Sequence, residues 1–166
     1  MIRDRRAQSA VWGFLAMMVF IAVSSGLVDI YRLYAARNWA YAVAQEAAMA
    51  GASQGRDWSA ISAFGEIRLN LPTARQEAED LIAAEMSARG ITGYAMDVRV
   101  LPDPTGGSIG GYPPKPVRLG TGLGNWSSNE PAVGVYLEMP VSWLLLDQLN
   151  IPVKTVRVFA AAGVAQ

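Results

Sequence analysis

The chain has 166 residues, of which 52% are hydrophobic and only 17% are charged. A soluble domain carries about a quarter charged residues, so this composition predicts that part of the chain lies in lipid. The 14 basic residues balance the 14 acidic ones, which leaves no net positive field to attract nucleic acid. The chain has no Cys and no His. This excludes disulfides, thiol nucleophiles, metal sites built on His or Cys, and a Ser-His-Asp relay.

The N-terminal region contains one long uncharged run. Residues 7–28 (AQSAVWGFLAMMVFIAVSSGLV) lie between Arg6 and Asp29 without a charged side chain. In a helix this length covers about 33 Å, which matches a hydrocarbon core of about 30 Å. A backbone in lipid must satisfy its own hydrogen bonds, so we predict a transmembrane helix over 7–28, preceded by a basic cytoplasmic tip over residues 1–6.

A cleaved signal peptide is the alternative, because Ala22, Val23 and Ser24 offer small residues at a plausible cleavage site. The uncharged run is longer than the roughly 7–15-residue apolar core of a signal peptide. We therefore expect an uncleaved anchor.

The arginines on either side of the run predict its orientation. Three precede it and two follow it closely: Arg3, Arg5 and Arg6 before, Arg32 and Arg37 after. Basic residues collect on the cytoplasmic side of a membrane. By this small margin we expect a cytoplasmic N-terminus, with residues 29–166 on the periplasmic or extracellular side.

The helix is expected to continue beyond the membrane, because residues 29–53 contain no Pro and are rich in Ala. The whole would be one helix of about 45 residues. Its outer half carries small residues that permit close approach of another helix or a sheet: Ala35, Ala36, Ala40, Ala44, Ala47 and Ala48. A helical turn is expected around 58–64 and a second helix over 74–89, with Thr73 and Gln76 as a capping box and Gly90 as the stop.

Three segments predict strands. Residues 94–101 alternate between apolar and charged side chains, and residues 133–141 and 153–164 are also typical of strands. A short apolar helical turn is expected over 143–149. Residues 102–132 contain seven Gly and six Pro and predict a long loop. The predicted fold is α+β: a long N-terminal helix, a second helix and a small, mainly antiparallel three-stranded sheet.

No segment predicts a catalytic, cofactor-binding or metal site. Residues 120–124 form a GxGxG sequence, but no helix follows to complete a phosphate-binding loop. Glu77, Glu79 and Asp80 are expected on solvated faces of a helix, and Asp103 and Glu138 have no visible partner. Asp97 with Asp103 lacks the spacing of a calcium loop.

Two further segments could have either a binding role or a structural role. Tyr112 with Pro113, Pro114 and Pro116, together with Trp126, could form a polyproline-like recognition segment; we expect an ordinary rigid loop. The run from Trp143 to Leu146 is too short to span a membrane and is expected to pack in the core.

The chain resembles the TadE/TadG-like proteins, the minor pseudopilins of tight-adherence (Flp-type) pilus systems. The resemblance lies in RDRRAQSAVWGFLAMMVF at 3–20 and DIYRLYAARNWAYAVAQEAAMAGA at 29–52, and KTVRVFAAAGVA at 154–165 also fits. It implies a non-enzymatic, pilin-like structural protein of the bacterial cytoplasmic (inner) membrane. Its helix would pack against lipid and other membrane subunits through Trp12, Gly13, Gly26, Tyr34 and Tyr41.

The sequence departs from that family at two positions. At the position of Ala7, the family commonly has a Gly that precedes the processing site. At the position of Trp12, it commonly has a Glu that assists assembly. These departures favour an alternative: an accessory single-span subunit that stabilises a larger integral-membrane complex while its outer domain covers a partner. A membrane-tethered enzyme is a third hypothesis, which the missing His and Cys disfavour, and we expect no enzymatic activity.

Overall fold

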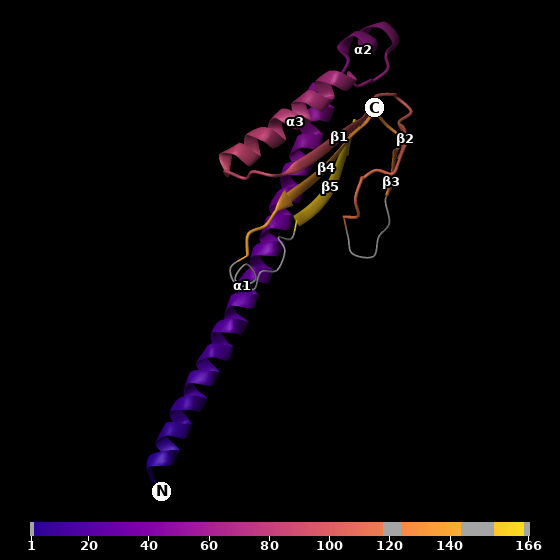
Figure 1. Cartoon of the computed structure of the whole chain (residues 1–166). Coiled ribbons are helices and arrows are strands. Elements are labelled where there is room, and N and C mark those ends of the chain that lie inside the picture. Colours follow the sequence, from indigo (N-terminus) through magenta and orange to yellow (C-terminus); the bar gives the residue numbers. More distant parts are fainter. Residues whose placement is uncertain (1, 118–123, 144–154, 165–166) are drawn as a thin grey trace. The chain divides into compact units, whose positions relative to one another are not determined.

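The computed structural model describes residues 2–117, 124–143 and 155–164. The chain divides into two compact units, and each is described by itself. Met1–Ala35 with Val141–Lys154 form the N-terminal unit, and Ala36–Pro140 with Thr155–Gln166 form the unit that holds the sheets, called the sheet unit below. The described elements follow in chain order (Figure 1): α1 (Ile2–Gln54), α2 (Trp58–Phe64), α3 (Leu71–Ala88), β1 (Ala95–Leu101), β2 (Gly107–Gly110), β3 (Asn125–Ser128), β4 (Ala132–Pro140) and β5 (Thr155–Gly163). The fold is α+β, as predicted.

Helix α1 is a single helix of 53 residues that starts in the N-terminal unit and ends in the sheet unit. This confirms the prediction of one continuous helix and extends it at both ends. Its part in the sheet unit buries a face of small side chains: Ala40, Val43, Ala44, Ala47, Ala48 and Ala52. Gly51 lies on the same face, and a Cβ there would be 2.5 Å from the Ala74 carbonyl oxygen of α3. The small residues therefore let α1 pack closely against α3.

Helix α3 begins three residues earlier than the sequence predicts, and its cap is a different residue. The Asn70 Oδ1 accepts a hydrogen bond from the Thr73 backbone N–H at 3.2 Å, which makes Asn70 the N-cap. The predicted capping box is wrong, because the Thr73 hydroxyl instead donates to Asn70 Oδ1 at 3.0 Å. Gly90 ends the helix as expected, with φ of +64° and an Ile91 N–H that donates to Met86 O.

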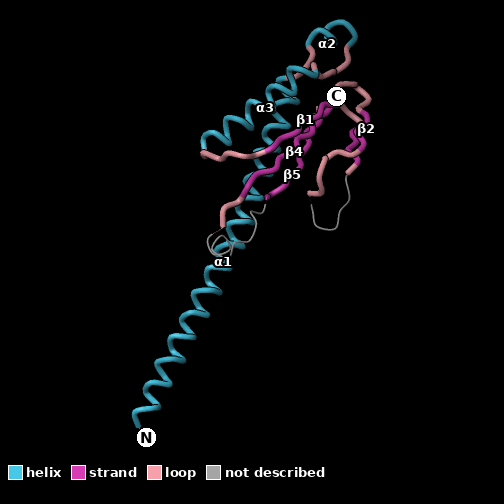
Figure 2. Tube along the Cα trace, viewed as in Figure 1, coloured by secondary structure: helices cyan, strands magenta, loops and turns pink. Residues whose placement is uncertain are grey.

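Strands β1, β4 and β5 form an antiparallel sheet in the order β1-β4-β5, and Figure 2 shows them as neighbouring magenta segments. One face of this sheet carries large apolar side chains. Residues directly opposite each other on paired strands share a face, so the apolar side chains of the three strands lie together. Val98 lies opposite Val135, and Leu137 lies opposite Val158. These side chains are buried, as are Ala74, Ala78, Ile82 and Met86 along α3. The main core of the sheet unit lies between this face and the helices.

The other face of the sheet is covered by part of the segment predicted to be a loop. Within residues 102–132, β2 and β3 pair antiparallel with Ile109 opposite Trp126. The rings of Tyr112 and Trp126 pack on Phe159 of β5, with centroids 5.4 and 6.1 Å away. These two short strands differ from the long loop that the sequence predicts. The helical turn predicted over 143–149 lies mostly outside the described residues.

Candidate functional site

The first half of α1 is an exposed apolar surface. Nearly every large apolar side chain from Val11 to Val28 is exposed. The helix is long and apolar enough to cross a membrane, and none of its most apolar window is buried inside the protein. Asp29, which ends the uncharged run, is only 1% exposed. Exposed apolar surface of this extent indicates contact with lipid or with another protein.

The residues predicted to pack against a partner lie on this helix and are open. Trp12 and Tyr34 are each 65% exposed, and Tyr41 is 49% exposed. A Cβ placed on Gly13 or Gly26 would have no atom within 4 Å. The described chain does not bring these five residues together in a pocket. They are spaced along one helix, where another helix could reach them.

Glu138 on β4 is the centre of a buried ionic cluster that the sequence did not predict. The Lys115 ammonium donates to its Oε2 at 2.6 Å and the Tyr136 hydroxyl at 3.0 Å. The Thr155 hydroxyl and the Arg157 Nε donate to its Oε1 at 3.0 and 3.2 Å. The expectation that Glu138 has no partner is therefore wrong. Three of its four partners lie 17 to 23 residues away in the sequence, so no local pattern could identify them.

The pKa of Glu138 reflects two opposing effects. Burial alone would raise this pKa, but the hydrogen bonds from Lys115, Tyr136, Thr155 and Arg157 lower it to about 2. The phenol of Tyr136 has a raised pKa, because it is buried and donates to the carboxylate. A carboxylate held ionised by four donors is a poor general acid or base at neutral pH, so the cluster is structural.

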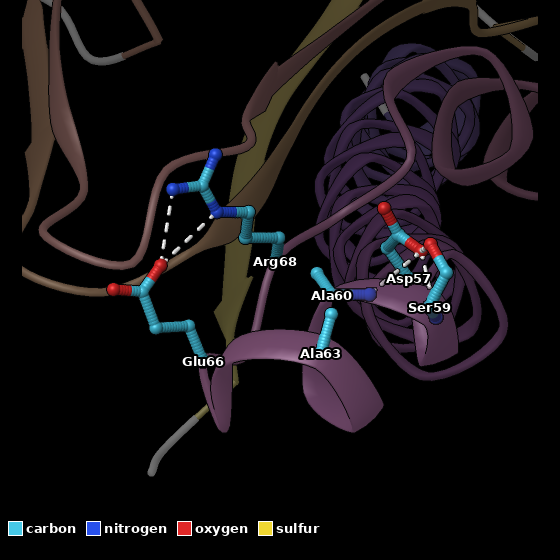
Figure 3. Close-up of a pocket in the computed structure, with 6 residues that line it drawn as sticks. All are labelled: Asp57, Ser59, Ala60, Ala63, Glu66 and Arg68. Carbon is cyan, nitrogen blue, oxygen red and sulfur yellow. Dashed lines mark hydrogen bonds and ion pairs between the residues drawn. The ribbon is translucent and has the colours of Figure 1, made fainter.

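Among the described residues of the sheet unit, two open depressions are lined by charged side chains, and neither gathers reactive groups. One, of about 550 Å³, is lined by residues of α2, its N-cap and the segment after it: Asp57, Ser59, Ala60, Ala63, Glu66 and Arg68 (Figure 3). Asp57 accepts hydrogen bonds from the Ser59 hydroxyl and from the N–H groups of Ser59 and Ala60, which lower its pKa. Glu66 pairs with Arg68 at 3.0 Å. The charged groups are thus satisfied locally as a helix cap and a surface ion pair.

The other depression, of about 600 Å³, also shows no catalytic arrangement. It is lined by Glu66, Pro104, Thr105, Asn129 and Glu130. Its described lining holds two carboxylates and one hydroxyl, that of Thr105, and no basic side chain. No group of three or more acidic side chains that could hold a metal ion occurs within the described residues.

The other sequence candidates have structural surroundings. Glu79 on α3 pairs with Arg75 at 2.6 Å, and Asp97 pairs with Arg99 at 2.9 Å. Tyr112 and Trp126 are buried, so their rings belong to the core and do not present a recognition surface. The GxGxG sequence lies outside the described residues except for Gly124.

Comparisons of the chain with protein-family models, with curated proteins and with solved structures gave no match.

Proposed function

We propose that this protein is a non-enzymatic, single-span membrane protein with a pilin-like role in the assembly of membrane subunits, as its resemblance to TadE/TadG-like pseudopilins implies. The exposed apolar half of α1 carries this proposal. A surface of about 20 apolar residues would be strongly unfavourable in water, whereas it matches the thickness of a bilayer. The second half of α1 is built into the core of the sheet unit, so the same helix would anchor that unit.

The proposed contacts with other subunits are made by the helix within the membrane. Small residues let helices approach closely in lipid, where packing replaces the hydrophobic effect as the main driving force. Gly13 and Gly26 have open space above their Cα atoms. Trp12 provides exposed aromatic surface next to Gly13, and the exposed Tyr34 lies on the same helix beyond the span. The proposed location is the bacterial cytoplasmic membrane, with the sheet unit on its outer side.

The accessory-subunit function is a second candidate, and a specific observation favours it. Trp12 occupies the position where the pilin family commonly has Glu, and its indole is exposed on α1. An indole cannot supply the charge that assists filament assembly. It suits the membrane interface, where one edge of the ring is apolar and the other can donate a hydrogen bond.

The experiment that tests both candidates is purification of the full chain in mild detergent, with the intact mass and all co-purifying proteins determined. Membrane extraction should require detergent and resist alkaline carbonate. Pilin-like proteins in the eluate would support the pilus function, whereas a stoichiometric set of unrelated membrane subunits would support the accessory function. A chain that is released by carbonate, or that purifies without any membrane protein, would contradict both.

Two glycine substitutions test the predicted helix contacts. Gly13→Leu or Gly26→Leu should reduce the co-purifying partner by about tenfold, because a loss of about 1.4 kcal/mol is expected when a close helix contact is obstructed. Val19→Leu, in the same apolar segment, is the matched control and should leave the partner bound. Equal recovery from all three variants would show that the glycines do not line the contact.

A further inference from the structure

The sheet of the sheet unit has two edges, and they are protected to different extents. Strand β1 carries the ion-paired Asp97 and Arg99, and just beyond its end the Leu69 N–H donates to Pro102 O. Charged side chains and added pairing both block further strands from joining an edge. Strand β5 has nine residues, and from Val158 to Gly163 it contains neither a charge nor a Pro. Among the described residues, the β5 edge is therefore the less protected of the two.

The register shows which backbone groups of β5 point away from the sheet. The Val164 N–H donates to Pro131 O, directly beyond the pair of Gly163 with Ala132. Hydrogen bonding to a neighbouring strand alternates along an antiparallel pair. The even-numbered residues of β5 therefore bond to β4, and the odd-numbered ones face outward: Thr155, Arg157, Phe159, Ala161 and Gly163. Within the described part of the chain, no strand pairs with these groups.

The side chains of β5 are self-complementary in size. Its sequence, TVRVFAAAG, has larger residues before Phe159 and small ones after it. If two copies run antiparallel with Phe159 opposite Phe159, Arg157 lies opposite Ala161 and Thr155 lies opposite Gly163. On the other face, Val158 meets Ala160 and Val156 meets Ala162. Apart from the central pair of Phe159 rings, each larger side chain thus has a small neighbour across the interface.

The same arrangement avoids repulsion between charges. The only charged residue of β5 is Arg157, which already pairs with Glu138 at 3.2 Å. In the antiparallel arrangement the two Arg157 residues are offset by four positions, or about 14 Å along the strands. This exceeds the Debye length of about 8 Å at physiological ionic strength, so their repulsion is screened.

We propose that the β5 edge binds the β5 edge of a second copy of this chain, in antiparallel register centred on Phe159. The two three-stranded sheets then form one continuous six-stranded sheet related by a twofold axis. The five outward-facing residues of each copy can form about ten backbone hydrogen bonds across the interface. This contact lies in the sheet unit and does not depend on the proposed membrane function of α1.

Cysteine cross-linking tests the register, because the chain has no native Cys. The two full-length variants Arg157→Cys and Ala161→Cys are mixed in equal amounts in detergent, and an oxidant is added. The mixed dimers should become disulfide-linked. They make up about half of all dimers by random pairing. Facing Cα atoms in such a pair are about 5.5 Å apart, within disulfide range. Each variant alone is the control and should not cross-link, since its two thiols would be about 14 Å apart. Absence of the mixed product would overturn the proposed register.

Proline substitution tests whether the edge itself makes the dimer. Ala161→Pro removes an outward N–H without breaking a bond to β4, so the chain should still fold and become monomeric by native mass measurement. Met96→Pro is the matched control, since its N–H faces outward from the β1 edge, and it should stay dimeric. Thermal melts of both variants check folding. A wild-type chain that is monomeric, or a folded Ala161→Pro variant that remains dimeric, would overturn the proposal.

Discussion

Glu138 remains charged in a nearly buried position because donors from three segments surround its carboxylate. Tyr136 precedes it on β4, Thr155 and Arg157 come from β5, and Lys115 comes from the segment that covers the sheet. Burying a carboxylate without such partners would be strongly unfavourable. The cluster therefore ties the covering segment to the sheet.

Replacing this carboxylate should destabilise the sheet unit in a way that depends on pH. The pKa of Glu138 falls from 4.5 to about 2 on folding, which corresponds to a contribution of at most about 3 kcal/mol. Because the folded pKa is the lower one, this contribution is present above pH 4.5 and is lost as the pH falls toward 2. Glu138→Gln should therefore lower the stability at pH 6 and make little difference near pH 2. Denaturant unfolding at several pH values measures the difference.

The control for this prediction is Glu46→Gln on the exposed face of α1. It removes the same charge from a solvated position and should change the unfolding free energy by less than about 0.5 kcal/mol. An equal loss from Glu138→Gln at pH 6 and pH 2 would contradict the electrostatic explanation. The loss would then come from the altered hydrogen bonding of the amide alone.

Helix α3 depends on Asn70 for its first turn. Asn70→Ala removes the acceptor of the Thr73 N–H, so we expect a loss of about 1 kcal/mol in the unfolding free energy. Gln76→Ala is the informative control. In a capping box the Gln76 side chain would bond to the backbone N–H of Thr73, whereas the structure makes Asn70 the cap. Thermal unfolding followed by circular dichroism compares the two variants. A larger effect from Gln76→Ala would favour the capping box.

The contact between α1 and α3 requires a glycine at one position. A Cβ on Gly51 would lie 2.5 Å from Ala74 O and 3.3 Å from the Cβ of Ala78. Gly51→Ala should therefore destabilise the sheet unit by about 1–3 kcal/mol, although Ala favours a helix by about 1 kcal/mol.

Gly26→Ala in the same helix is the matched control, since nothing lies within 4 Å of its added Cβ. Its melting temperature should not fall. If both variants melt like the wild type, the close approach of α1 to α3 is incorrect.

The elements with a regular local pattern could be predicted from the sequence. The alanine-rich run after Asp29 predicts the continuation of α1, and the alternation before Leu101 predicts β1. Each pattern repeats over several residues, so it remains readable without knowledge of tertiary contacts.

Other features depend on contacts between distant residues or on small differences in local backbone geometry. Strands β2 and β3 have four residues each and contain mainly Gly, Ser and Asn, which have low strand propensity. They are ordered by the packing of Trp126 and Ile109 on the sheet. The Glu138 cluster joins residues up to 23 positions apart. Asn70 and Thr73 are both good N-caps, and only the backbone geometry distinguishes them.

At the scale of the whole molecule, the distribution of arginines should determine how the protein sits in the membrane. Three arginines precede the apolar segment and two follow it closely, so the bias toward a cytoplasmic N-terminus is small. Replacing Arg5 and Arg6 by Gln should therefore yield a mixture of two orientations. Replacing Arg32 by Gln strengthens the original bias and should leave one orientation.

Single cysteines measure this orientation directly, because the chain contains none. Ile2→Cys marks the basic tip, and Ser87→Cys marks an exposed position on α3. In intact spheroplasts, a membrane-impermeant maleimide should label Ser87→Cys at once, and should label Ile2→Cys only after lysis, because the span separates the two sites. The opposite pattern would reverse the orientation. Labelling of both sites without lysis would mean that α1 does not cross the membrane, and its apolar half would then require a protein partner to cover it.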